Sequence, residues 1–195
     1  MMADFDYLNL PGVLKGITST TEDLELTMGA DMRFGSLLRT LAASSLGAEA
    51  LQLGAGSGLL TAWLLDGLPR DGRLLACEAD PELHGVVRRF LGRDGRLELR
   101  AESPEELLGG SGRTWSLIVA GSPLTVAGQA DRLLHALSPG GMLVVGGMAP
   151  AEGRRPAEHT AADQLAAELQ ALPELRTSLL DEAPGVLLAS HAAGR

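Results

Sequence analysis

The sequence predicts an α/β fold with a doubly wound, mostly parallel sheet that ends in an antiparallel C-terminal hairpin. Short apolar strand patterns alternate with helical patterns along most of the chain. Residues 115–120 form a continuous apolar run, which is typical of a strand buried on both faces of a parallel sheet. The last two strand patterns flank a short Asp-Glu-Ala-Pro-Gly turn, which indicates a hairpin.

Length and composition limit the classes of protein to consider. The 195 residues fit a single domain, 1–195, in which residues 1–20 form an N-terminal arm. A net charge of −9 provides no basic field for a polyanion, so we expect no nucleic acid partner. The acidic N-terminus does not resemble a signal peptide, and no apolar run approaches the roughly 20 residues that cross a bilayer. We therefore expect a cytoplasmic protein with no membrane partner.

The first two helices are predicted from a start signal and from an apolar stripe. Hydroxyl and acidic side chains from Thr20 onward are typical of a helix start. Apolar residues from Phe34 to Ser45 follow helical spacing, and Gly47 closes that helix. This second helix is expected to lie on the sheet.

The stretch from Leu51 to Glu78 carries the strongest functional signal. A strand at 51–53 leads into the turn Gly54-Ala55-Gly56-Ser57-Gly58, and a helix follows at once. Glycine suits a tight strand-to-helix turn and lets a ligand approach the backbone and the helix N-terminus. A second strand, 73–77, then places Glu78 where a carboxylate can accept hydrogen bonds from both ribose hydroxyls. These features predict a nucleoside-containing cofactor.

The middle of the chain continues the alternation of helix and strand. Asp80 and Pro81 start a helix that Gly92 ends, and a short strand follows at 97–99. Ser103 and Glu106 then form a capping box. Residue 102 therefore belongs to the same sheet edge as the glycine turn. The single cysteine, at position 77 in an apolar strand, is expected to be buried and inert.

Four further elements follow the strand at 115–120. A helix is predicted from an apolar stripe between Val126 and Leu137, and a strand at 142–145. A loop rich in glycine and proline spans 146–156, and a helix begins near Thr160 and ends at Leu172. The closing strands are placed at 175–180 and 186–190.

From Met28 to the C-terminus, the order of these pieces resembles the catechol and caffeoyl-CoA type of O-methyltransferase. The resemblance rests on Met28 followed by Gly35, on LQLGAGSG, on LPRDGRLLACEAD and on LSPGGMLVV. It implies a class I, Rossmann-like fold and S-adenosyl-L-methionine as the cofactor. The residues that it implies along the methionine and ribose are Met28, Gly54, Ala55, Gly56, Gly58, Glu78 and Ala79, and those implied to reach the adenine are Glu102 and Ser103.

The chain departs from this family at the positions that serve catalysis. Many members bind a divalent cation with acidic and amide side chains, but the corresponding positions here hold Gly121, Gly146 and Gly147. Glycine offers no side-chain oxygen to a hard cation. Leu124 stands where those enzymes have a catalytic lysine, and Lys15 is the only lysine in the chain. We therefore expect no metal.

Methyl transfer from a sulfonium needs chiefly positioning, and a base only if the acceptor keeps its proton at neutral pH. The candidate bases are Asp31, His159 and Asp163, and an imidazole can titrate near neutrality. The function expected from the resemblance is O-methyl transfer to a small-molecule acceptor without a metal.

Two other functions remain open on the sequence alone. The first alternative is a catalytically inactive S-adenosylmethionine-binding regulatory or partner protein. The second is a nicotinamide-dependent oxidoreductase, which Leu59 disfavours because the dinucleotide motif has a small residue at that position. The closing hairpin and the N-terminal arm offer apolar edges at which a homodimer could form.

Overall fold

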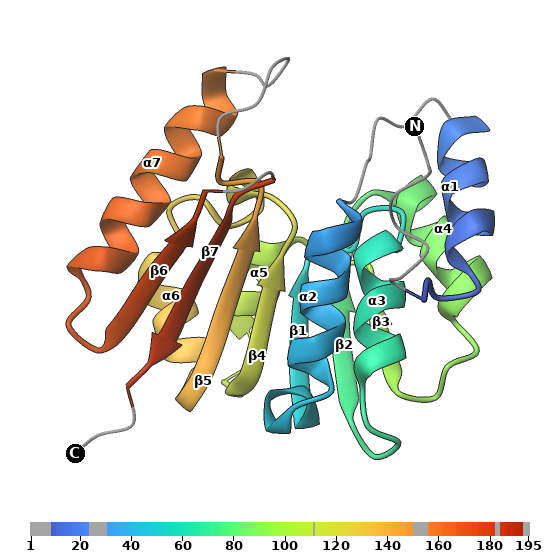
Figure 1. Ribbon diagram of the computed structural model, residues 1–195, viewed down its shortest axis with the longest axis horizontal. Coiled ribbons are helices and arrows are strands. Elements are labelled where there is room, and N and C mark those ends of the chain that lie inside the picture. The colour runs from blue at the N-terminus through green and yellow to red at the C-terminus, as the bar shows by residue number, and fades with distance from the viewer. Residues whose placement is uncertain (1–8, 24–30, 111, 150–155, 182–183, 193–195) are drawn as a thin grey trace.

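The computed structural model describes residues 9–23, 31–110, 112–149, 156–181 and 184–192. Seven strands form one sheet in the order β3-β2-β1-β4-β5-β7-β6 (Figure 1). The first five strands are parallel, whereas β7 is antiparallel to both β5 and β6, which confirms the predicted fold class. The strands are β1 (Glu49–Leu53), β2 (Arg73–Cys77), β3 (Leu97–Arg100), β4 (Trp115–Ala120), β5 (Leu137–Gly146), β6 (Leu175–Leu180) and β7 (Val186–His191).

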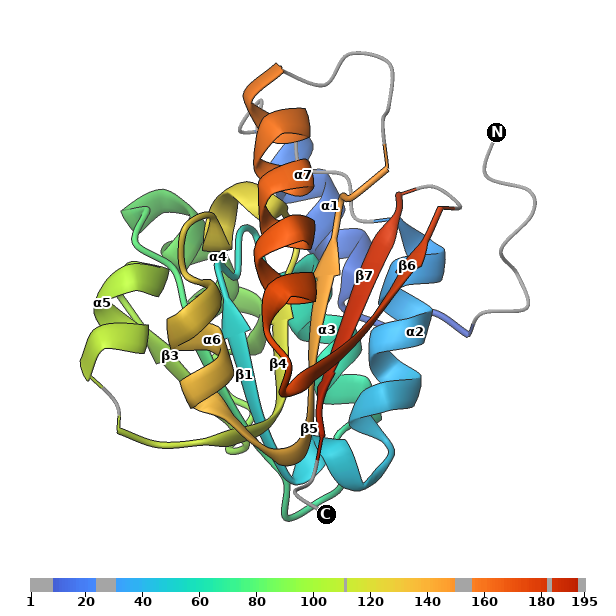
Figure 2. The ribbon, with the colours of Figure 1, turned by 90° about the vertical axis from the view of Figure 1, so that its left-hand side faces the viewer.

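Helices cover the two faces of the sheet in separate layers. The α2, α3 and α4 helices lie on one face, and α5, α6 and α7 lie on the other (Figures 1 and 2). The α1 helix packs on α3 and α4. The helical elements are α1 (Leu14–Asp23), α2 (Met32–Ala42), α3 (Leu59–Gly67), α4 (Pro81–Leu91), α5 (Pro104–Gly110), α6 (Ala130–Ala136), α7 (Pro156–Ala171) and the 3₁₀ turns η2 (Ser45–Ala48) and η3 (Pro123–Val126).

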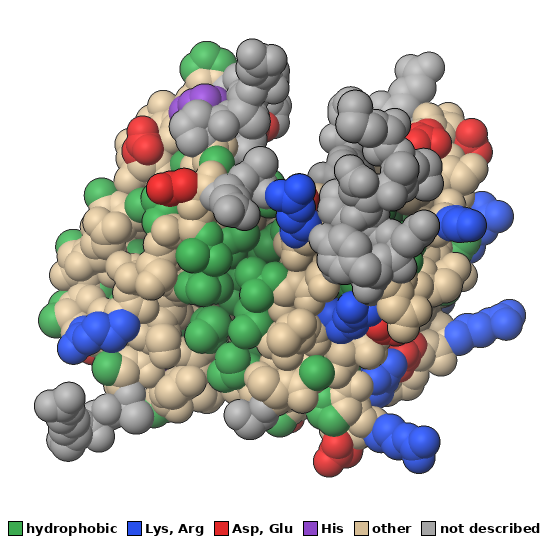
Figure 3. All heavy atoms as spheres, in the orientation of Figure 1, with side chains coloured by type: hydrophobic (Ala, Val, Ile, Leu, Met, Phe, Trp, Pro, Cys, Tyr) green, Lys and Arg blue, Asp and Glu red, His purple; other side chains and the backbone are tan. Residues whose placement is uncertain are grey.

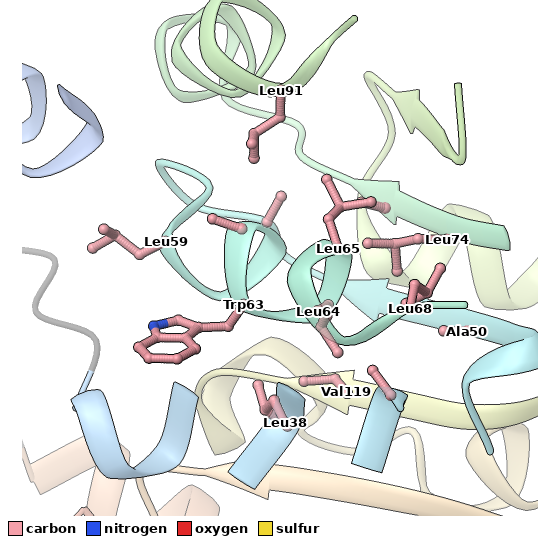
Figure 4. Packing of buried hydrophobic residues seen from close by; sticks show 14 of the residues in the cluster. Leu38, Ala50, Leu59, Trp63, Leu64, Leu65, Leu68, Leu74, Leu91 and Val119 are labelled. Atoms are coloured by element: carbon pink, nitrogen blue, oxygen red, sulfur yellow. The ribbon is translucent and has the colours of Figure 1, made fainter. Parts of the chain in front are cut away.

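Two hydrophobic cores lie on opposite faces of the sheet because successive side chains of a strand point in opposite directions. In β4, Val119 joins the core under α2 and α3, whereas Ile118 joins the core under α6 and α7. Figure 4 shows Leu38 of α2 and Trp63 of α3 in the first of these cores. Both strand faces are thus buried, as the apolar run at 115–120 predicts.

Glycines allow α2 and α3 to pack closely. A side chain at Gly35 in α2 would collide with the indole ring of Trp63 in α3. At the other end of the contact, a side chain at Gly67 would collide with the backbone carbonyl of Arg39. The resulting close approach fixes α3, and with it the turn at its N-terminus.

The N-terminal helix differs from the prediction. The helix start expected at Thr20 is wrong, because α1 begins at Leu14 and this residue lies inside it. The side chains of Leu14 and Ile17 are buried on a common helical face, and the hydroxyl of Thr21 donates to the carbonyl of Ile17. The arm predicted for residues 1–20 is thus helical from Leu14 onward, and its first eight residues lie outside the described part.

Two boundaries in the C-terminal half also differ. The helix expected through Leu137 ends at Ala136, and Leu137 instead begins β5, where it pairs with Trp115. The α7 helix begins at Pro156 rather than near Thr160, which suits proline's fixed φ at a first helical position. No helix in the described ranges is long and apolar enough to cross a membrane.

Candidate functional site

The glycine turn lies at the carboxyl edge of the sheet, between β1 and α3. Gly54, Gly56 and Gly58 have φ angles of 71°, 57° and 95°, a backbone region that disfavours residues with a side chain. A side chain at Gly54 would also come within 2.9 Å of Thr125, in the segment after β4. The chain therefore crosses from β1 to α3 in a turn that few other residues could adopt.

This turn lies at the switch point of the sheet. The chain passes from β1 to β2 and β3 on one side, and then continues on the other side of β1 with β4 and β5. In doubly wound sheets, ligands bind in the crevice at such a point. Gly58 is the N-cap residue of α3. It has no side chain, so it makes no side-chain hydrogen bond to the first N–H groups of the helix.

Glu78 follows β2 and contacts the glycine turn directly. Its Oε2 accepts a hydrogen bond of 2.7 Å from the backbone N–H of Gly56, and its Oε1 accepts one of 3.0 Å from Asp80. The side chain is half-buried. The structure thus brings the predicted acid and the predicted turn together across two neighbouring strands.

A buried polar pair joins the two elements that flank the glycine turn. Gln52 of β1 is fully buried, and its Oε1 accepts a hydrogen bond of 2.7 Å from the hydroxyl of Thr61 in α3. The Ser57 hydroxyl, within the turn, is also buried and has no partner among the described residues. Thr61 could not be predicted from the sequence, because a contact between a strand and the next helix leaves no local pattern.

The residues predicted beside the adenine follow β3. Glu102 is half-buried, and it is near enough to Cys77 and Arg100 to affect the pKa of each. Ser103 forms the predicted capping box: its N–H and its hydroxyl both donate to Glu106 over 2.8 Å. This bonding lowers the pKa of Glu106. Ala79 is exposed at the same edge, and Met28 lies outside the described residues.

The three candidate bases fall in two separate places. His159 and Asp163 lie one turn apart on α7 and line a cavity of about 230 Å³, together with Asp181 and Met148. Asp31 does not line it; it caps α2 by accepting hydrogen bonds of 2.8 and 3.1 Å from the N–H groups of Arg33 and Phe34. Asp181, after β6, was missed because its sequence context indicates only a turn.

Many members of the resembled family have metal ligands at three positions that are glycines here, and neighbouring side chains fill the space that a larger residue would need at two of them. A side chain at Gly146 would come within 2.5 Å of the ring of Phe34, and one at Gly121 within 3.0 Å of Leu60. Gly147 has a φ of 72°. Asp and Asn adopt this backbone region more readily than most residues with a side chain, but it is strained for them too. Across the described ranges, no group of three His, Cys, Asp or Glu side chains is placed to hold a metal. Among the described residues, these three glycine positions therefore offer no side-chain ligand to a divalent cation.

Cys77 is buried at the end of β2, as predicted. Burial raises the pKa of its thiol to about 11, and the nearby carboxylates of Glu78 and Glu102 add to that rise. A thiol with such a pKa is protonated at neutral pH and is a poor nucleophile. It therefore contributes to packing.

Comparison with known proteins finds similarity in structure only. No protein-family model matches the sequence, and neither does any curated protein. The cofactor-bound protein Rv0187 from MTB superposes with a TM-score of 0.83 at 19% identity, over 98% of this chain and 94% of that one. The O-methyltransferase TomG from Streptomyces achromogenes, which is involved in tomaymycin synthesis and is in complex with SAM, gives a TM-score of 0.80 at 18% identity, over 96% and 94% of the two chains.

An O-methyltransferase from Bacillus cereus in complex with SAH gives a TM-score of 0.78 at 16% identity, over 92% of this chain and 90% of that one. These matches cover nearly the whole length of both partners. The chain has the Rossmann-like fold of class I S-adenosylmethionine-dependent O-methyltransferases.

Proposed function

We propose that this chain is an S-adenosyl-L-methionine-dependent methyltransferase that methylates an oxygen of a small molecule without a metal. The observation that carries the proposal is the hydrogen bond between Glu78 and the N–H of Gly56 at the switch point of the sheet. It joins a backbone turn suited to an amino acid tail with a carboxylate suited to ribose hydroxyls. The solved structures of the same fold in complex with SAM or SAH support this choice of nucleoside.

The proposed cofactor contacts follow from these positions. The backbone of Gly54, Ala55, Gly56 and Gly58 would hold the methionine part, and Glu78 would accept from the ribose while Ala79 lies beside it. A carboxylate has about four lone-pair sites, so Glu78 can keep its two backbone bonds and still accept others. Glu102 and Ser103 would reach the adenine. When bound, the cofactor supplies a methyl group on a positively charged sulfur.

Metal independence is part of the proposal, and the packing at the carboxyl edge supports it. Gly121, Gly146 and Gly147 offer no side-chain oxygen, and the ring of Phe34 fills the space above one of them. The acceptor oxygen would bond to the methyl carbon as the carbon–sulfur bond breaks, with its electron pair moving to sulfur. The hydroxyl proton would pass to water or to a protein base.

The base is proposed to come from α7. His159 and Asp163 line one cavity together with Asp181, so this cavity gathers an imidazole and two carboxylates, which are side chains that serve as general bases. Asp31 already caps α2 with one of its oxygens, which makes it the weaker candidate. Replacing His159 with Ala is expected to lower kcat for a hydroxyl acceptor and to leave cofactor affinity unchanged.

Calorimetric titration with S-adenosylmethionine, S-adenosylhomocysteine and NAD tests the cofactor. We expect the first two to bind and NAD not to bind. A methyl-transfer screen over small hydroxyl compounds, run with and without EDTA, then tests catalysis. Binding without any transfer would favour an inactive regulatory or partner protein, and activity lost in EDTA would contradict metal independence. A homodimer and a cytoplasmic location stay predictions.

A further inference from the structure

The methionine part of the proposed cofactor is an amino acid tail, a zwitterion that needs polar partners. The outer surface between α2 and β7 offers few, because hydrophobic side chains gather there (Figure 3). The glycine turn offers backbone N–H groups, but the hydroxyls in it and just after it are not accessible. Ser57 is 1% exposed, and Thr61 is fully buried and bonded to Gln52. A side-chain donor for the tail would have to come from another element.

Thr125, in η3 after β4, lies across the switch point from the glycine turn. A Cβ atom at Gly54 would lie 2.9 Å from the Cγ2 atom of Thr125 and 3.5 Å from its Oγ1 atom. The β1 and β4 strands pair with each other, so this contact spans the crevice between their carboxyl ends. The hydroxyl of Thr125 is therefore next to the backbone that is proposed to hold the methionine part.

The hydroxyl of Thr125 can bind a ligand without losing a contact. The residue is half-buried, and across the described ranges its hydroxyl makes no hydrogen bond; its backbone N–H donates to the carbonyl of Ser122 over 3.2 Å. The hydroxyl of Ser122 is used differently, because it accepts from the N–H of Leu124 over 3.3 Å. In the segment from Gly121 to Val126, Thr125 thus has the one hydroxyl that does not hold the local backbone.

We propose that the hydroxyl of Thr125 donates a hydrogen bond to the carboxylate of the cofactor's methionine part, and so selects a nucleoside that carries an amino acid tail. A hydroxyl has one O–H donor, and hydrogen bonds to an ionised acceptor are stronger than those between neutral groups. From its place across the crevice, Thr125 would hold the tail opposite the backbone of the turn. This inference rests on the proposed methyltransferase function. It adds a cofactor-binding residue that lies outside the glycine motif.

The test compares two ligands that differ in the amino acid tail. S-adenosylhomocysteine has the tail, whereas methylthioadenosine has the same nucleoside and a thioether without it. Thr125→Val removes the hydroxyl and keeps the shape of the side chain. We expect calorimetric titration of this variant to show an affinity for S-adenosylhomocysteine that is about tenfold lower than in the parent protein, because a hydrogen bond to a charged group is lost. The affinity for methylthioadenosine should not change.

Thr125→Ser is the matched control, because it keeps the hydroxyl and removes the methyl group that lies nearest to Gly54. It should bind S-adenosylhomocysteine within about twofold of the parent protein. Thr125→Ala adds no bulk, and it gives the same comparison if the valine variant does not fold. It should lose affinity for S-adenosylhomocysteine and keep its affinity for methylthioadenosine.

The parent protein separates this inference from the proposed function. If the parent binds S-adenosylhomocysteine and the valine variant binds it equally well, the role of Thr125 is wrong and the methyltransferase proposal stands. Equal losses of affinity for both ligands would also overturn that role, because they would mean that the substitution disturbs the turn and not a contact with the tail. If the parent binds neither S-adenosylmethionine nor S-adenosylhomocysteine, the methyltransferase proposal fails, and the role of Thr125 fails with it.

Discussion

Glu78 holds two stretches of backbone with one carboxylate. It accepts from Gly56 in the turn after β1 and from Asp80 at the start of α4, and both bonds involve an ionised acceptor. The turn is therefore positioned before any ligand arrives. Such preorganisation lowers the entropic cost of binding.

Glu78→Gln tests this arrangement. An amide keeps one acceptor oxygen and directs its NH₂ group at one of the two N–H donors, so a charge-assisted bond becomes a repulsive contact. We expect the affinity for S-adenosylmethionine to fall roughly 10- to 100-fold, which corresponds to about 1.5–3 kcal/mol. Calorimetric titration measures it. Glu82→Gln, an exposed change in the first turn of α4, should retain full affinity. Equal affinities in the two variants would contradict the role of Glu78.

Cys77 predicts a specific dependence of stability on alkaline pH. Its pKa is raised by burial from an ordinary value of 9.0 to about 11. Between these values the unfolded chain has lost the thiol proton while the folded chain keeps it, so stability falls as pH rises. The loss by pH 11 should be about 2 kcal/mol.

Urea denaturation at pH 8, 10 and 11 checks this, with Cys77→Ala as the comparison. Lysine and tyrosine titrate in the same pH range. The two proteins are therefore compared by the slope of the free energy of unfolding against pH. Parallel slopes would mean that the thiol titrates normally in the folded state.

How much of the site the sequence predicts depends on how local each contact is. The glycine turn and the capping box of Ser103 follow from residues a few positions apart, and the structure shows both. Glu78 lies 22 positions from Gly56, but its place follows from the order of strand, turn, helix and strand, and the structure brings the two residues together. The contacts of Thr61 with Gln52 and of Phe34 with Gly146 join separate elements. No spacing rule along the chain encodes such pairs.

Among the helices, the contact between α2 and α3 depends on Gly35, which has no side chain. Gly35 lies under the indole ring of Trp63, which is fully buried, and the guanidinium of Arg39 lies 5.0 Å from the centre of the same ring. Gly35 is one of the residues on which the family resemblance rests, and in this chain it allows α2 and α3 to pack closely.

Gly35→Ala is expected to destabilise the protein by about 1–3 kcal/mol, because the new methyl group must displace a packed indole. Gly85→Ala provides a matched control in α4, where the added methyl meets nothing within 4 Å. That change should stabilise by about 0.5–1 kcal/mol through helix propensity. Midpoints of urea unfolding measure both. Stabilisation by both alanines would show that the α2–α3 contact can relax.

Element boundaries were predicted best where a capping residue marks them. The start of α4 at Pro81 and the whole of β2 agree with the prediction, because Asp80 and the turn before Arg73 are strong local signals. Leu137 was assigned to a helix because its spacing continues the stripe of α6. Pairing with Trp115 in β4 overrides that spacing, and such pairing depends on a residue 22 positions away.

In the molecule as a whole, the order of the last three strands could not be predicted. The sequence indicates a hairpin but does not say which of its strands joins the parallel sheet. The structure places β7 between β5 and β6, so β6 is the edge strand, and its carboxyl end lines the cavity that contains His159 and Asp163. The pairing of strands far apart in the sequence thus brings Asp181 into the cavity that His159 and Asp163 line.

Cofactor binding should stabilise the entire fold, because the turn, Glu78 and the residues after β3 are joined to the sheet by separate strands. A ligand that binds only the folded state at 100 times its Kd adds about 2.7 kcal/mol. For a chain of this length, that corresponds to a rise in Tm of about 5–11 °C. Thermal unfolding with S-adenosylmethionine should show this rise, and NAD at the same concentration should not. EDTA should leave both Tm values unchanged, since no described group of side chains fits a metal. A Tm that falls in EDTA would mean that a cation holds the fold together, and the metal-independent mechanism would then have to be abandoned.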